Sequence, residues 1–298
     1  MSNSLKTSHI HRPYVKRAFS SAAESYDHHA VLQREIGERL LAHLNFTKIE
    51  PKRILDIGCG TGYFTRLLTD KFKKQHIVGL DLSASMLAYA KKKQPMRLPW
   101  HGKRHFCNAD GCMLPFADKS FDLVTSNLAM QWIANPADMM AEMRRVLAPN
   151  GLILFSTFGR RTLSELRQSL ASIAQDNQNT AQGRVLPFPD IMSLGDALNQ
   201  IPLEMPVIDS DLFTLTYPDA MALVRELKGL GASSSAIAGR KGGLYGPRLL
   251  KQLNTIYADK HRMENGQVRA TFEALYAQAW YKETPYQPKG NIIPIELQ

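Results

Sequence analysis

Three acidic residues follow three successive predicted strands, in positions suited to hold a nucleoside. Asp56 lies in the apolar segment 53–57, Asp81 closes the next apolar segment, and Asp110 follows the third one. Because parallel strands end at one edge of a sheet, we expect the three carboxylates to lie near one another. An acid after the second strand of such a fold accepts hydrogen bonds from ribose hydroxyls, and Asp110 is suited to accept one from an adenine amino group.

A glycine-rich run, DIGCGTG at 56–62, follows the first predicted strand and opens a predicted helix. Glycine lets the backbone approach a ligand closely, and a helix N-terminus offers free N–H groups to an anion. A dinucleotide-binding loop requires glycine or alanine three residues after Gly60, but Tyr63 occupies that position. The loop therefore favours a ligand with a carboxylate over one with a pyrophosphate.

These residues need a sheet whose strands alternate with helices. The predicted strands are 53–57, 76–80, 104–107, 121–126, 152–157, 207–215 and 267–281, and the predicted helices between and before them are 31–44, 63–72, 83–92, 136–147, 163–174 and 191–198. Strands joined by such helices form right-handed parallel units, whereas the last strand is expected to be antiparallel. The pattern predicts an α/β fold with a Rossmann-like, doubly wound, mostly parallel seven-stranded sheet.

The same pattern divides the chain into four parts. These are N-terminal helices (1–48), a cofactor-binding core (49–216 and 266–282), a helical insertion (217–265) and a tail (283–298). The insertion would lie near the carboxyl edge of the sheet, where it could act as a lid or contact the substrate. Between Glu226 and Asp259 it has no acidic residue, and its basic residues are Lys228, Arg240, Lys241, Arg248 and Lys251.

Composition excludes several classes of protein. The 298 residues carry a formal net charge of +10, and 44% of them are hydrophobic, which is typical of a globular protein. Three cysteines without a CxxC pair argue against a disulfide framework and for a reducing compartment. No apolar run reaches the roughly 20 residues needed to span a bilayer. We expect a cytoplasmic enzyme that binds neither membrane nor nucleic acid; its oligomeric state is not predicted.

Residues 1–23 leave the mitochondrion open as a second cellular location. They carry basic residues and serines but no acid, which loosely resembles a mitochondrial transit peptide. The alternative interpretation is a short tail that leads into a helix.

Five sequence motifs, in order, resemble the class I S-adenosylmethionine-dependent methyltransferases. They are DIGCGTG, GLDLS, NADGCMLPF, FDLVTSNLAMQW and RVLAPNGLILFSTF, which together cover residues 50–158. The resemblance implies that Asp56 and the glycines contact the methionine part of the cofactor, Asp81 the ribose and Asp110 the adenine. The full set of cofactor-binding residues that it implies is Asp56, Gly58, Cys59, Gly60, Gly62, Asp81, Leu82, Met86, Asp110, Gly111 and Asn127. S-adenosylhomocysteine would be the product.

Two further segments lie outside the cofactor-binding motifs. KRAFSSAAESYDHHAVLQREI, near the start, and ALVRELKGLGAS, in the insertion, resemble the malonyl-acyl-carrier-protein O-methyltransferases of biotin synthesis. That family converts the free carboxylate of a malonyl thioester to its methyl ester. The resemblance implies an acidic acyl carrier protein, or malonyl-coenzyme A, as the substrate.

A carboxylate is already ionised at neutral pH, so this reaction needs orientation rather than a general base. We expect Arg225, or else Lys228, to orient the carboxylate, and Tyr26 to close over the methyl group or bind substrate. Trp132 could line the acyl pocket, and Arg240 and Lys241 could dock the acidic carrier. Packing or a solvated surface is an alternative role for each of them. We find no metal-ligand spacing and predict no metal.

Three other functions share parts of this pattern. Another small-molecule methyltransferase would have the same motifs over 50–158. A cofactor-binding protein that resembles the hydroxylase-like assembly factors of mitochondrial complex I would share the Tyr-Asp pair in the N-terminal segment. A nucleic-acid methylase would rest on the net charge alone.

Overall fold

A computed structural model describes residues 10–94, 102–177, 185–232 and 247–283. Its seven-stranded sheet has the order β3-β2-β1-β4-β5-β7-β6. The first five strands in this order are parallel, β7 runs antiparallel to β5, and β6 runs antiparallel to β7. The predicted Rossmann-like, mostly parallel seven-stranded sheet is confirmed, and so is the antiparallel direction of the last strand.

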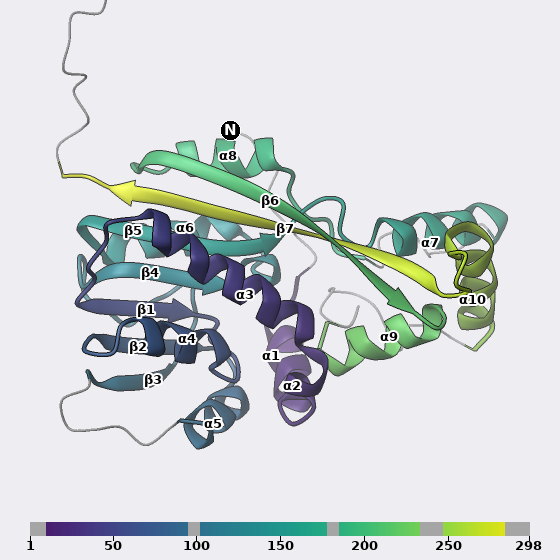
Figure 1. Ribbon diagram of the computed structural model, residues 1–298, viewed down its shortest axis with the longest axis horizontal. Helices are drawn as coiled ribbons and strands as arrows, with labels where there is room; N and C mark the ends of the chain where they lie inside the picture. The colour runs from purple at the N-terminus through teal and green to yellow at the C-terminus, as the bar shows by residue number, and fades with distance from the viewer. Residues whose placement is uncertain (1–9, 95–101, 178–184, 233–246, 284–298) are drawn as a thin grey trace, which may run out of the picture.

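The elements follow the predicted alternation (Figure 1). They are α1 (Arg12–Ala22), α2 (Tyr26–His29), α3 (Val31–His43), η1 (Leu44–Phe46), β1 (Arg53–Ile57), α4 (Tyr63–Lys71), β2 (His76–Asp81), α5 (Ala84–Lys92), β3 (Arg104–Asn108), β4 (Phe121–Asn127), η2 (Met130–Trp132), α6 (Pro136–Val146), β5 (Leu147–Phe158), α7 (Ser164–Asn177), α8 (Ile191–Asn199), β6 (Glu204–Tyr217), α9 (Ala220–Gly229), α10 (Pro247–His261) and β7 (Val268–Tyr281).

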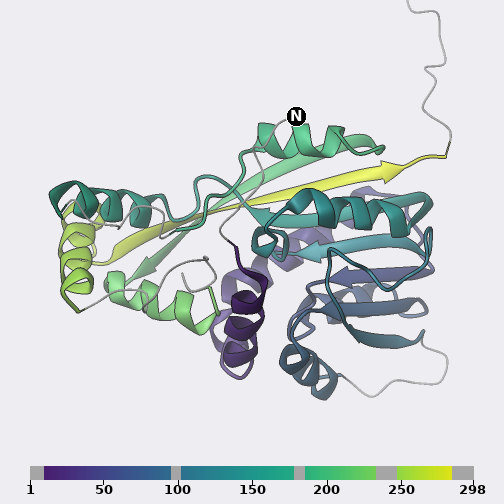
Figure 2. The same ribbon diagram turned by 180° about the vertical axis from the view of Figure 1, so that it is seen from behind.

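Helices cover both faces of the sheet, as Figures 1 and 2 show from opposite sides. Helices α3 and α4 pack on one face, and α6 and α8 pack on the other. On α3, Leu32, Ile36 and Leu40 recur every four residues and are buried, so one apolar stripe faces the strands. Within the described residues, one large core cluster lies on each face of the sheet.

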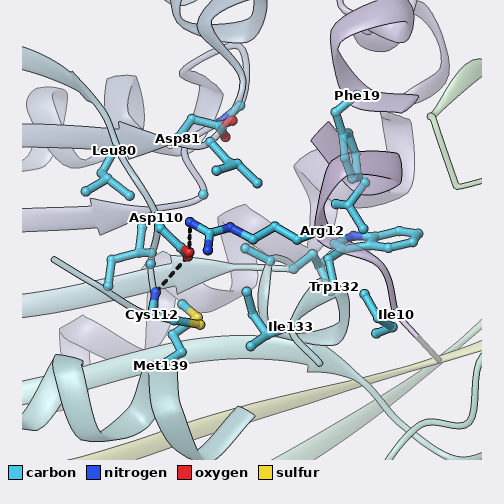
Figure 3. Close-up of a pocket in the computed structure, with 18 of the residues that line it drawn as sticks. Ile10, Arg12, Phe19, Leu80, Asp81, Asp110, Cys112, Trp132, Ile133 and Met139 are labelled. Carbon is cyan, nitrogen blue, oxygen red and sulfur yellow. Dashed lines mark hydrogen bonds and ion pairs between the residues drawn. The ribbon is translucent and has the colours of Figure 1, made fainter. Parts of the chain in front are cut away.

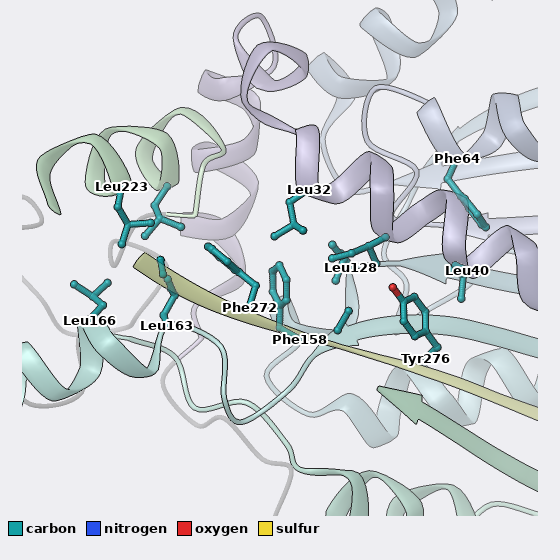
Figure 4. Close-up of a cluster of buried hydrophobic side chains, with 14 of the residues drawn as sticks. Leu32, Leu40, Phe64, Leu128, Phe158, Leu163, Leu166, Leu223, Phe272 and Tyr276 are labelled. Carbon is teal, nitrogen blue, oxygen red and sulfur yellow. The ribbon is translucent and has the colours of Figure 1, made fainter. Parts of the chain in front are cut away.

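The strands β6 and β7 are much longer than β1 to β3 and extend beyond them toward α7, α9 and α10 (Figure 1). The buried side chains there continue the core of the α3 face without interruption. Leu223 of α9 and Leu166 of α7 belong to the same cluster as Leu32 and Phe64, joined through Phe158 and Phe272 (Figure 4). The helices of the insertion therefore share a core with the sheet.

The N-terminal helices α1 and α2 stand beside the carboxyl ends of the parallel strands, between the sheet and α9 (Figures 1 and 2). Helix α1 contacts α5, and α2 contacts α9. The segment that precedes the sheet in sequence thus covers the edge at which its strands end. Among the described residues, no helix has the length and apolar character needed to cross a bilayer.

Candidate active site

A cavity of about 310 Å³ lies at the carboxyl ends of the parallel strands. Its walls come from the glycine loop after β1, the end of β2, the loop after β3, the segment from β4 to α6, and the N-terminal helices. Open α/β sheets bind ligands in this position, where the strand order reverses. Figure 3 shows side chains of α1 facing those of the loop after β3 across this pocket.

The glycine loop presents its backbone to the pocket. Gly58, Gly60 and Gly62 have φ of 72°, 53° and 79°, a region that side chains disfavour. Gly58 and Gly60 line the pocket, and a Cβ on Gly60 would meet no atom within 4 Å. Cys59 is buried and Gly62 precedes α4, so neither of these two predicted contacts lines the pocket.

Asp81 lies at the end of β2 and lines the pocket. One carboxylate oxygen accepts the N–H of Gly60 at 2.9 Å, and the other accepts the N–H of Ser83 at 2.7 Å. Burial raises the pKa of this carboxyl, and the two N–H groups oppose that effect. Each oxygen keeps a lone pair for a ligand hydroxyl.

Leu82 and Met86 follow Asp81 and also line the pocket. Ser83 caps the helix here, because its hydroxyl accepts the N–H of Met86 at 3.3 Å. This cap fixes the first turn of α5 and so places Met86 against the cavity.

Asp110 reaches the same pocket from the loop after β3 (Figure 3). Its side chain is 10% exposed; Oδ1 accepts the N–H of Cys112 at 2.9 Å, and Oδ2 forms an ion pair with Arg12 of α1. Gly111 lines the pocket next to it, where a Cβ would press on Ile57 at 2.9 Å. The sequence analysis predicted Asp110 but not Arg12.

Asp56 does not line the pocket; it lies below the glycine loop, 1% exposed. Its Oδ2 accepts the hydroxyl of Thr65 at 2.5 Å, while Oδ1 has no hydrogen-bond partner among the described residues. The resemblance implied a contact with the methionine part of the cofactor, whereas the structure gives Asp56 a contact with α4. The buried carboxylate instead ties β1 to the helix that follows the loop.

The pKa of Asp56 leads to a testable pH dependence. Burial raises this pKa to about 7, the hydroxyl of Thr65 opposes the rise, and the charge of Asp81 adds to it. Between the ordinary value of 3.8 and about 7, the folded protein holds a proton that the unfolded chain has lost. Its free energy of unfolding should therefore fall as the pH rises through this window, by at most about 1.4 kcal/mol per pH unit.

Asp56→Asn should remove this part of the pH dependence. Urea unfolding from about pH 5 to about pH 8 should show the variant gaining stability relative to the wild type as the pH rises. Asp70→Asn, which changes an exposed carboxylate on α4, is the matched control and should track the wild type. Parallel curves for Asp56→Asn and the wild type would contradict the assignment.

Asn127 ends β4 and lines the pocket, but its side chain is engaged within the protein. Its Oδ1 accepts the hydroxyl of Ser156 at 2.6 Å, and its Nδ2 donates to the carbonyl of Gln33 at 3.1 Å. The amide group therefore joins β4 to β5 and α3. Only the backbone of Asn127 is therefore left to contact a ligand.

Aromatic side chains cover the end of the pocket nearest the N-terminal helices. Phe19 packs edge-on against Trp132, with ring centroids 5.2 Å apart, and Tyr26 lies 6.3 Å from Phe19. All three line the pocket. Burial raises the pKa of Tyr26, and the charges of Asp81 and Asp27 add to the rise, so its hydroxyl stays protonated at neutral pH.

Side-chain bonds fasten these helices to the cofactor side of the pocket. Asp27 of α2 accepts the hydroxyl of Thr61, in the glycine loop, at 2.6 Å and pairs with Lys93 at the end of α5. The hydroxyls of Ser20 and Ser83 lie 2.9 Å apart, which joins α1 to the cap of α5. Side-chain bonds thus join the N-terminal helices to the glycine loop and to α5.

The basic residues expected to hold the substrate lie elsewhere or outside the described residues. Arg225 and Lys228 are exposed on α9 and do not line the pocket. The reason is that α9 buries its opposite face, and Arg225 lies 4.0 Å from Asp219 at the start of the same helix. Arg240 and Lys241 fall within 233–246, outside the described residues.

Arg12 and Phe19 are pocket residues that the sequence analysis missed. Arg12, Val15 and Phe19 follow one another at intervals of three and four residues, so they share one face of α1. The spacing in the sequence indicates that the three residues share a helix face, but it does not show that this face lines the pocket.

Fold and pocket together define a class of enzyme. The strand order, the glycine loop, and two carboxylates that follow β2 and β3 form a cradle for a nucleoside with an amino-acid chain. Gly60 leaves open space in this cradle, and Asp81 and Asp110 keep acceptors for hydroxyl and amino groups. The chain is an S-adenosylmethionine-dependent methyltransferase.

Comparisons with known proteins support this class of enzyme and identify a family within it. Residues 55–155 match the family model described as a methyltransferase domain. A malonyl-acyl-carrier-protein O-methyltransferase of Halorhodospira halophila is 40% identical over 271 residues, 91% of this chain and 88% of the relative. One of Methylovorus sp. is 38% identical over 291 residues, 97% of this chain and 95% of the relative. The chain belongs to the malonyl-acyl-carrier-protein O-methyltransferase family.

Solved structures show the same fold at low identity. The YcgJ protein of Bacillus subtilis has a TM-score of 0.57 and 17% identity, covering 83% of this chain and all of the other. A methyltransferase-like protein of Bacillus halodurans has a TM-score of 0.57 and 15% identity, covering 82% and 99%. These neighbours support the architecture alone.

Proposed function

We propose that this enzyme methylates the free carboxylate of a malonyl group carried on acyl carrier protein, the step that the sequence resemblance assigns to biotin synthesis. When bound, S-adenosylmethionine supplies a methyl group on a positively charged sulfur, which the carboxylate accepts with release of S-adenosylhomocysteine. Relatives that bear this name cover about nine-tenths of the chain and supply the substrate class.

The observation that carries the proposal is a pocket without a free general base. No histidine or lysine lines the cavity within the described ranges. Asp81 is bonded to two backbone N–H groups, and Asp110 to Arg12 and a backbone N–H. Asp138, the third acid, accepts the side-chain amide of Asn135 at 2.7 Å. Because each of these carboxylates already accepts a hydrogen bond or forms an ion pair, the pocket favours an acceptor that is already ionised over one that must lose a proton, such as a phenol.

The remaining acidic groups of the pocket stay protonated at neutral pH. Burial raises the pKa of Cys112 to about 12, and the neighbouring carboxylates of Asp110 and Asp138 add to it. The pKa of Tyr26 is also raised, by burial and by the charges of Asp81 and Asp27. Tyr26 is therefore suited to donate a hydrogen bond to the substrate rather than to remove a proton, which favours an acceptor already ionised, as a carboxylate is.

We assign the residues to two sides of the pocket. On the cofactor side, Asp81 would accept the ribose hydroxyls and Asp110 the adenine amino group, with the backbone of Gly58 and Gly60 beside the methionine part. Leu82, Met86 and Gly111 would pack against the nucleoside. On the acceptor side, Phe19, Tyr26 and Trp132 would exclude water and hold the malonyl group close to the methyl.

The direct test uses the full-length protein, labelled methyl donor and malonyl-acyl carrier protein. We expect a mass increase of one methylene group on the malonyl moiety and its loss on alkaline hydrolysis, as an ester requires. Acetyl-acyl carrier protein, which lacks the free carboxylate, is the control and should stay unmodified. A methylated phenol or carbon in an acceptor panel, or cofactor binding without transfer, would instead support one of the alternative functions.

The choice between carrier protein and coenzyme A should depend on charge. Arg248 and Lys251 are exposed on α10, in the stretch that lacks acids, and Arg240 and Lys241 belong to the same stretch. Arg248→Glu combined with Lys251→Glu should raise the KM for malonyl-acyl carrier protein by about 10-fold at low ionic strength. The effect should fade at high salt and be much smaller for malonyl-coenzyme A.

A second charge reversal keeps this test specific. Lys48 and Lys52 are exposed before β1, at the amino edge of the sheet, so Lys48→Glu with Lys52→Glu should leave the KM nearly unchanged. A flat KM for the α10 variant at low salt would contradict docking on α10. The cytoplasmic location of the protein, and its division into core, lid and tail, also remain predictions.

A further inference from the structure

Arg12 is the one positively charged side chain that lines the pocket within the described part of the chain. It is the first residue of α1, and its side chain crosses the cavity from the side of Trp132 to Asp110 (Figure 3). Val15 and Phe19 lie on the same face of the helix and also line the pocket. The other basic residues of α1, Lys16 and Arg17, are exposed and do not reach it.

The pairing of Arg12 is exchangeable. Its side chain is 57% exposed although its partner Asp110 is only 10% exposed, so the guanidinium enters from the open side of the cavity. Asp110 keeps the N–H of Cys112 as a second donor. The cofactor side needs this carboxylate for an adenine amino group, which offers a neutral donor in place of the guanidinium. Arg12 can then turn to another carboxylate without leaving Asp110 unsatisfied.

A carboxylate bound on the acceptor side of the pocket would need a positively charged partner. Phe19, Trp132 and Ile133 present apolar surface there, and a carboxylate that leaves water for this surface needs a charged or hydrogen-bonded partner. Arginine meets that need with N–H donors in a fixed planar fork. Arg225 and Lys228, expected to fill this role, face solvent on α9.

We propose that Arg12 is the residue that binds the malonyl carboxylate and so selects the free acid over its methyl ester. The guanidinium holds one carboxylate oxygen while the other remains available for methylation. The ester carries no charge, so it loses the ion pair with Arg12 and is released. This inference rests on the proposed function and names the specificity residue of the same site.

Binding in the absence of turnover tests the inference. Calorimetry with the S-adenosylhomocysteine complex of the full chain compares malonyl-pantetheine with its methyl ester, and small thioesters keep the carrier-docking surface out of the measurement. Wild type should prefer the acid by on the order of 10- to 100-fold, as expected for a hydrogen bond between charged groups. Arg12→Gln should lose most of this preference because its affinity for the acid alone falls. Arg12→Lys should retain part of the preference.

Arg17→Gln is the matched control, because Arg17 lies on the same helix with its guanidinium near the ring of Tyr14; it should bind both ligands as the wild type does. Preserved preference in Arg12→Gln would overturn the inference. Equal losses for acid, ester and S-adenosylhomocysteine would also overturn it, since Arg12 would then serve the cofactor or the fold. A wild type that makes no methyl ester from any malonyl thioester would instead overturn the proposed function.

Discussion

Replacing Asp81 with alanine should weaken the binding of S-adenosylmethionine by about 100-fold or more. The carboxylate lies in the pocket at the end of β2, held by the N–H groups of Gly60 and Ser83. Its two oxygens are the acceptors available for the ribose hydroxyls, and each hydrogen bond to a charged group contributes about 1.5 to 3 kcal/mol. Calorimetric titration with S-adenosylmethionine and S-adenosylhomocysteine measures the loss.

The variant also leaves two backbone N–H groups without their acceptor, so its free energy of unfolding should fall. Urea unfolding of the same preparation separates this effect from the loss of affinity. Asp70→Ala removes an exposed carboxylate of α4 and should change neither quantity. An unchanged affinity in folded Asp81→Ala would remove this residue from the cofactor site.

Gly58→Ala should destabilise the fold by about 2 to 5 kcal/mol. A Cβ at this position would overlap with that of Ala129, in the segment that follows β4, and φ is 72°. Overpacking costs roughly 1 to 3 kcal/mol, and the left-handed conformation adds about 1 to 2 kcal/mol for a residue with a side chain. The loop must shift, so cofactor affinity should fall as well.

Two further variants divide this loss into its causes. Gly266→Ala, at φ 81° with no atom within 4 Å of a Cβ, should show the conformational cost alone. Adding Ala129→Gly to Gly58→Ala removes the overlapping methyl group and should recover the steric part. Equal destabilisation by Gly58→Ala and Gly266→Ala in urea would show that the contact with Ala129 has no effect.

The cofactor side of the site could be predicted because its chemistry is local in sequence. Asp81 and the glycine loop directly follow short apolar strands, and parallel pairing of β1 with β2 brings their ends together. To predict these pocket residues, it was enough to know the direction of each strand and the residue at its end. Asp56 was the exception, since its position inside the strand buried it against Thr65.

Strand lengths were harder to predict where turn residues enter the sheet. The predicted strand 152–157 is β5, Leu147–Phe158, because Pro149, Asn150 and Gly151 continue the strand instead of ending it. Asn150 has φ 61°, and the pairing of β4 with β5 shifts register between Phe121 and Leu123. Such an irregularity depends on the neighbouring strand, which a local pattern does not contain.

The acceptor side depends on tertiary packing, and the pocket cation lies on α1 instead of on α9, the helix expected from the sequence. Arg225 lies on α9, whose buried residues Leu223, Val224 and Leu227 turn it toward solvent. Arg12 reaches the cavity because α1 packs across the carboxyl edge of the sheet. No periodicity within residues 1–23 specifies that docking position.

Asp27 provides a physical connection through which the binding of the two ligands would be coupled. Its bond to Thr61 and its pairing with Lys93 connect α2, which carries Tyr26, to the glycine loop and to the end of α5. Coupling of this kind is reciprocal: a donor that orders the glycine loop also orders the acceptor cavity, and an acceptor in that cavity tightens the hold on the donor. The empty enzyme should accordingly bind either ligand more weakly than the enzyme that already holds the other.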